Sequence, residues 1–117
     1  MESKNVTALY FSPTGGTAQV ARDIAAKLKG ESRELDVTVK AENTAFAPGD
    51  LVVAAVPVYG GRVPAPVAER LSHVSGGGAF AVAVAVYGNR AYEDALLELK
   101  NLLEARGFRV IGAGAFL

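Results

Sequence analysis

The first apolar segments of the chain predict a strand followed by a helix. Residues 6–11 form a short, β-rich apolar run. After it, Val20, Ile24 and Leu28 lie four residues apart, which is the spacing of side chains on one face of a helix. Gly30 is a natural end for this helix. The chain therefore opens with a βα unit.

The next two apolar segments differ in pattern, and the difference predicts their places in a sheet. Residues 35–39 alternate between apolar and polar side chains, as expected of an edge strand with one face in water. Residues 51–56 are apolar without alternation, which predicts a central strand covered on both faces. The connection of residues 41–49 is too short for a crossover helix, so we expect one irregular turn there.

Two further helix–strand units follow. The first helix is expected to begin at Pro64 or Pro66, because proline is tolerated in a first turn. Residues 79–86 predict a second buried strand, with alanines on one side. The last helix is expected to end at Gly107, before a final strand over residues 108–116. The buried stripes of the two helices are expected at Val63, Val67, Leu71 and Val74, and at Tyr92, Ala95, Leu96, Leu99, Leu102 and Leu103.

This order of elements predicts an α/β fold with a doubly wound, parallel, five-stranded sheet in the order 2-1-3-4-5. We expect one domain over residues 1–117. No helix follows the fifth strand, so right-handed crossovers leave the first helix alone on one face of the sheet. Strands three to five would then expose apolar side chains, which predicts a homodimer through the uncovered face or a missing partner domain.

The composition narrows the classes of function. The 12 basic and 12 acidic side chains give no surplus of positive charge for nucleic acid or an anionic membrane. The chain has no cysteine and one histidine, His73, which excludes a disulfide framework, a thiolate nucleophile and a cysteine or imidazole metal cluster within it. Neither a membrane-spanning run nor a secretory signal is recognisable, so we expect a soluble cytoplasmic protein.

The loop between the first strand and the first helix has the composition of a phosphate site. Free N–H groups at a helix N-terminus attract an anion, hydroxyl groups add donors, and glycines let the backbone approach closely. The alternative is a capped helix with a glycine-assisted turn. The loop lacks both the lysine of a mononucleotide loop and the spacing of a dinucleotide fingerprint, which favours a lone phosphate monoester. Its residues are Ser12, Pro13, Thr14, Gly15, Gly16 and Thr17.

Two more loops are expected at the same edge, because ligands of parallel sheets bind at the carboxyl ends of the strands. Each brings an aromatic ring beside a glycine, which suits a flat, conjugated ligand with a phosphorylated tail. Tyr92 also fits helix packing and Tyr87 a supporting role, whereas Tyr59 lies in a glycine-flanked turn. The loops contain Pro57, Val58, Tyr59, Gly60, Gly61 and Arg62, and Tyr87, Gly88, Asn89, Arg90, Ala91 and Tyr92.

These loops resemble those of the flavodoxin family, and the resemblance extends over essentially the whole chain. The Ser-x-Thr-Gly-x-Thr pattern that begins at Ser12 matches the family's loop for the phosphate of FMN. Residues 56–64 resemble flavodoxin-like domains fused to ferredoxin modules, with Tyr59 where the family often has a ring-stacking aromatic residue. Tyr92 falls at a second stacking position. The chain departs from the family in lacking the fifth helix and in its neutral charge.

The resemblance implies an FMN-binding electron-transfer protein, a one-electron carrier through the flavin semiquinone, with ferredoxin-type redox proteins as partners. It implies that the Tyr59–Gly60 peptide turns its carbonyl toward the flavin, and that N–H groups of residues 88–90 contact the ring. For Arg62 and Arg90, two placements stay open: near the flavin rim as positive charges, or in solvent as loop arginines. No catalytic residue and no metal ligand are assigned.

Two alternative functions also stay open. The first is an FMN-dependent NAD(P)H oxidoreductase that reduces a flavin or a quinone, although no nicotinamide motif is present in the sequence. The second is a non-redox interaction module that binds a partner through the bare sheet face and has a vestigial flavin site. Rapid bleaching of bound flavin by NAD(P)H would favour the first, and failure to bind FMN would favour the second.

Overall fold

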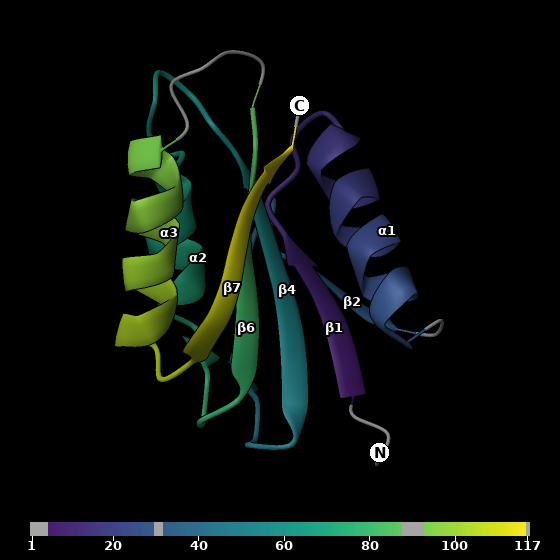
Figure 1. Cartoon of the computed structure of the whole chain (residues 1–117). Coiled ribbons are helices and arrows are strands. Elements are labelled where there is room, and N and C mark those ends of the chain that lie inside the picture. Colours follow the sequence, from purple (N-terminus) through teal and green to yellow (C-terminus); the bar gives the residue numbers. More distant parts are fainter. Residues whose placement is uncertain (1–4, 30–31, 88–92, 117) are drawn as a thin grey trace.

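The computed structural model describes residues 5–29, 32–87 and 93–116 (Figure 1). The main sheet has five parallel strands in the order β2-β1-β4-β6-β7, which confirms the doubly wound order predicted from the sequence. The strands of this sheet are β1 (Asn5–Tyr10), β2 (Arg33–Asp36), β4 (Asp50–Pro57), β6 (Phe80–Val86) and β7 (Arg109–Phe116), and the helices are α1 (Gly16–Lys29), α2 (Pro66–Leu71) and α3 (Glu93–Ala105).

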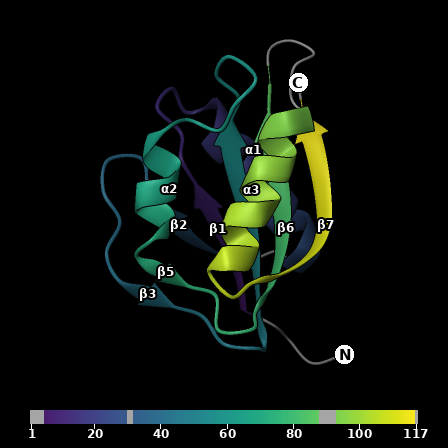
Figure 2. The ribbon, with the colours of Figure 1, turned by 90° about the vertical axis from the view of Figure 1, so that its left-hand side faces the viewer.

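The helices divide unequally between the two faces of the sheet. α1 lies alone on one face, whereas α2 and α3 lie together on the other (Figures 1 and 2). The larger core lies under α2 and α3, where Val67, Leu71, Leu99 and Leu103 are buried as the helical spacing predicts. Among the described residues, no helix is long and apolar enough to cross a membrane.

α1 contacts the sheet mainly through small side chains. Ala18, Ala21 and Ala25 are buried, whereas Val20 and Ile24 are half-buried at one side of this line. The sequence pattern selected the larger apolar residues Val20, Ile24 and Leu28 for one face of this helix. The alanines, however, allow the helix to approach the strands more closely. The close packing fixes the first turn of α1 relative to the end of β1.

The edge strand β2 begins at Arg33, two residues before the alternating segment, and ends at Asp36, so only two residues of the predicted strand lie in it. Val37 is buried, but Val39 is 83% exposed, because the chain turns away after Asp36. The turn is held by the backbone N–H of Thr38, which donates to Oδ1 of Asp36 at 2.9 Å. This turn brings Thr38 next to the loop after β1, where its hydroxyl oxygen accepts a hydrogen bond from the backbone N–H of Ser12.

The link of residues 41–49 contains no helix, as predicted, but it does contain a short strand that the sequence analysis missed. β3 (Thr44–Ala45) pairs in parallel with β5 (Val74–Ser75) to form a second, two-stranded sheet (Figure 2). Two residues are too few to show a strand period, so no sequence pattern could reveal this pair. The small sheet ties the link to the chain after α2.

The sheet face beside α1 is only partly exposed where no helix covers it. Val84 is fully buried, Val82 and Val86 are half-buried, and Phe116 on β7 is 42% exposed. The ring of Phe116 lies over Gly114, since a Cβ at that glycine would meet the ring at 3.5 Å. The uncovered face is therefore present, with Val82, Val86 and Phe116 partly exposed on it.

The predicted self-association through this face stays a prediction, and Phe116 gives a test of it. Replacing Phe116 with Ser removes the most exposed ring of the face, so a dimer that buries it should dissociate at lower protein concentration. Sedimentation velocity over a concentration series measures this change. Leu97→Ser on α3 is the matched control, because Leu97 is 56% exposed on the opposite face. A wild-type protein that stays monomeric at high concentration would show the prediction to be wrong.

Candidate functional site

The carboxyl ends of β1, β4 and β6 lie together at one edge of the sheet. Backbone hydrogen bonds continue past the strands there: Phe11 N–H donates to Ala55 O at 3.2 Å, Val58 N–H to Val86 O at 3.1 Å, and Tyr87 N–H to Phe116 O at 2.8 Å. The first two of the three loops selected from the sequence therefore start from fixed points on this edge. In the third loop, Tyr87 is half-buried, and Gly88, Asn89, Arg90, Ala91 and Tyr92 lie outside the described residues.

The first loop is held in place by hydroxyl groups at its base. The backbone N–H of Ser12 donates to Oγ1 of Thr38 at 2.8 Å, and Oγ of Ser12 accepts from the N–H of Ala18 at 2.9 Å. Gly15 has a φ of +95°, a left-handed conformation that favours glycine, and α1 begins at the next residue. The loop is thus fixed at both ends around an exposed turn.

That turn presents backbone donors that the fold does not use. In the part of the chain that the structure describes, the N–H groups of Thr14, Gly15, Gly16 and Thr17 have no hydrogen-bond partner. A Cβ added at Gly15 or Gly16 would meet nothing within 4 Å, so the space on the side-chain side of these two glycines is open. The first turn of α1 has no acidic residue to repel an anion. This donor set fits a phosphate group.

The second loop is a tight hairpin. Tyr59 and Arg62 exchange backbone hydrogen bonds, N–H of Tyr59 to O of Arg62 at 2.9 Å and N–H of Arg62 to O of Tyr59 at 3.0 Å. Gly60 and Gly61 between them have φ values of +60° and +80°, a combination typical of a type I′ turn. Because its carbonyl already accepts a hydrogen bond, the Tyr59–Gly60 peptide is less free to turn than expected, and the Gly60–Gly61 peptide is the freer one.

A cavity of about 580 Å³ separates the first loop from this hairpin. Its wall is mostly apolar, and the side chain of Tyr59, which is 50% exposed, forms part of it. A flat ring system fits such a wall. The residues that line the cavity are Phe11, Pro13, Tyr59, Arg62, Val63, Pro64, Ala65, Pro66 and Glu98.

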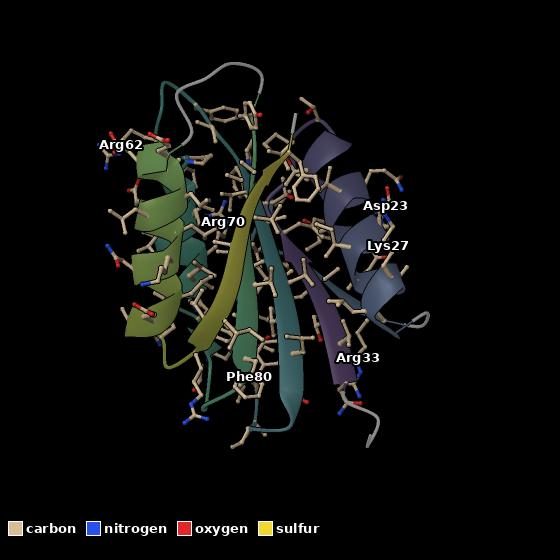
Figure 3. All side chains as sticks on the ribbon, in the orientation of Figure 1. Asp23, Lys27, Arg33, Arg62, Arg70 and Phe80 are labelled. Carbon is tan, nitrogen blue, oxygen red and sulfur yellow. The ribbon has the colours of Figure 1, made fainter. Side chains whose placement is uncertain are left out.

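Arg62 does not carry an unpaired charge at this cavity. Its Nε and Nη2 donate to Oε1 and Oε2 of Glu98, both at 3.0 Å, beside the upper turns of α3 (Figure 3). The hydrogen bonds raise the pKa of Arg62 and lower the pKa of Glu98. The Arg62 side chain is 68% exposed and also lines the cavity, so the ion pair is compatible with both placements that the sequence left open.

Two residues of the site were missed in the sequence. Glu98 was given no role, and its partner Arg62 is 36 residues away, so no local pattern connects them. Thr38 was predicted to lie on the solvent-facing side of an edge strand, but its hydroxyl oxygen accepts a hydrogen bond from the backbone N–H of Ser12. Both contacts depend on how the elements pack, which periodicity alone does not specify.

Comparisons with known proteins agree with this architecture. A family model described as a flavodoxin domain matches residues 8–73, which is more than half of the chain and includes the first two loops. Among solved structures, a flavoprotein from Lactobacillus acidophilus in complex with FMN has a TM-score of 0.74 at 18% identity, over 97% of this chain and 93% of that one. Two-electron reduced flavodoxin from Megasphaera elsdenii has a TM-score of 0.66 at 18% identity, over 95% and 85%. No curated protein sequence matches.

The Arg62–Glu98 pair predicts a specific dependence of stability on pH. Because the hydrogen bonds from Arg62 lower the pKa of Glu98 in the folded protein, its carboxylate stabilises the fold at neutral pH, and this contribution is lost as pH falls through the lowered pKa. In urea unfolding, Glu98→Gln should therefore reduce the free energy of unfolding near neutral pH, and the difference from wild type should shrink on acidification. A difference that is equal at every pH would contradict the assignment.

Proposed function

The chain belongs to the flavodoxin domain family, and on that premise we propose that it binds FMN and carries electrons one at a time between redox proteins. The observation that carries the proposal is the set of four adjacent N–H groups, from Thr14 to Thr17, that the fold leaves without partners. Such a set at a helix N-terminus suits the doubly charged phosphate of FMN. The structural similarity to a flavoprotein in complex with FMN supports the same ligand.

The residues of the first two loops would divide the binding of FMN between them. Ser12, Thr14 and Thr17 would contribute hydroxyl groups around the phosphate, beside the backbone donors. Tyr59 would pack against the ring system, and the Gly60–Gly61 peptide could present either its N–H or its carbonyl, because glycine tolerates both orientations. When bound, FMN supplies the redox chemistry, while the protein supplies position, partial exclusion of water and electrostatics.

The expected partners are redox proteins, including the ferredoxin type. Tyr59 is 50% exposed and the cavity beside it is open, which supports a ring site at the surface, as exchange of electrons with a docked protein requires. The formal net charge of zero gives no long-range steering of such a partner. Recognition would therefore depend on short-range contacts around the cavity.

The phosphate site predicts a selective loss of affinity. In a Thr14→Ala, Thr17→Ala double variant, the affinity for FMN should fall about tenfold or more, because hydrogen bonds to a charged group are lost. The affinity for riboflavin should hardly change, because riboflavin lacks the phosphate. Fluorescence titration measures both constants. Thr44→Ala, in the small second sheet, serves as the control. Equal effects on FMN and riboflavin would show that the threonines do not contact the phosphate. A wild-type protein that binds no FMN would refute the proposed function.

The mode of electron transfer has a separate test. A one-electron carrier should take up electrons in two resolved steps when the FMN-loaded protein is titrated with dithionite under anaerobic conditions. Absorbance spectra distinguish the steps. NAD(P)H alone should leave the flavin oxidised, with dithionite reduction as the positive control. A single two-electron step, or rapid bleaching by NAD(P)H, would favour the reductase alternative instead.

A further inference from the structure

A carboxylate on α3 holds the second loop from outside. Oε1 of Glu98 accepts from Nε of Arg62 at 3.0 Å and from the backbone N–H of Val63 at 3.1 Å, and Oε2 accepts from Nη2 of Arg62 at 3.0 Å. One side chain thus makes three hydrogen bonds to two consecutive residues of the loop between β4 and α2. We call these contacts the Glu98 clamp.

We propose that Glu98 is a positioning residue, which orients Tyr59 for the ring of the cofactor by holding the Tyr59–Arg62 hairpin. The inference rests on the proposed function, because it assigns a role toward the FMN ring. The hairpin's own two hydrogen bonds join Tyr59 to Arg62 and do not fix the pair relative to the sheet. A Cβ at Gly60 would meet nothing within 4 Å, so no neighbour packs against the side-chain side of this residue of the turn.

The clamp connects the hairpin to a rigid part of the fold. Ala95, Leu99 and Leu103 of α3 are fully buried against the sheet, and Glu98 lies in the same turns of the helix. Its side chain is 30% exposed, and the bidentate geometry limits the movement of Arg62. An exposed ion pair alone contributes little, but a partly buried carboxylate that also accepts a backbone N–H constrains the loop itself.

The Arg62–Glu98 pair also lies between two cavities at the surface. The cavity of about 580 Å³ beside Tyr59 has Arg62 and Glu98 in its wall, and so does a second cavity of about 390 Å³ on the outer side of α3. Leu97 and Asn101 line only the second. Loss of the pair would open the proposed ring site toward this second cavity. It would also leave the charge of Arg62 unpaired beside the ring, which favours a reduced, negatively charged flavin.

The clamp is tested with Glu98→Ala, with Glu98→Gln as the conservative variant and Glu104→Ala as the control. Glu104 lies on the same helix and pairs with Lys100 at 3.4 Å, so its loss removes an equal charge without touching the hairpin. In cofactor-free protein, amide exchange at Val63 should accelerate about tenfold in Glu98→Ala and less in Glu98→Gln, whose amide oxygen can still accept. The control should match wild type.

With cofactor, Glu98→Ala should weaken FMN and riboflavin by the same factor, about three- to tenfold, because the hairpin serves the ring and not the phosphate. The midpoint potential of bound FMN should shift to a more positive value, and neither quantity should change in Glu104→Ala. Unchanged exchange at Val63, or a loss of affinity confined to FMN, would overturn the clamp. If wild type binds no flavin, the proposed function fails, while the exchange measurement still reports on whether Glu98 holds the loop.

Discussion

The candidate site depends on backbone N–H groups at the start of α1 that the fold leaves without partners, so that a ligand can use them. The first N–H groups of a helix have no partner within the helix, and a fold usually satisfies them with a capping side chain. Here the hydroxyl of Ser12 bonds Ala18 and leaves the earlier donors free. Thr38 holds the base of the loop, and the left-handed Gly15 completes the turn. The loop is therefore rigid and still has unused donors.

The parallel sheet brings the second part of the site to the same edge. Each strand ends beside its neighbour, so the hairpin after β4 lies across a cavity from the loop after β1. Tyr59 then adds an apolar surface next to a polar cradle, which is a combination that a phosphorylated, conjugated cofactor fits. α3 contributes through Glu98, and the inferred clamp would make the ring site depend on a helix distant in sequence.

Much of this could be predicted from the sequence, because strongly periodic segments determine which elements form. The unbroken apolar run of β4 and the alanine–valine alternation of β6 correctly predicted buried central strands. The two-residue strands β3 and β5 could not be predicted from a pattern. The alternation of residues 35–39 misplaced β2, which spans Arg33–Asp36, because the side chain of Asp36 holds a turn there. Likewise, the loop residues were evident from their chemistry, whereas the pairing of Arg62 with Glu98 follows from packing.

The most direct test of the account is a titration of ¹⁵N-labelled protein with FMN, followed by amide chemical shifts. Because their N–H groups are the free donors, the amides of Thr14, Gly15, Gly16 and Thr17 should shift most on addition of FMN, and riboflavin should shift them far less. Saturation with FMN that leaves these four amides unchanged, with shifts gathered on β7 or nowhere, would contradict the claim that this turn binds a phosphate.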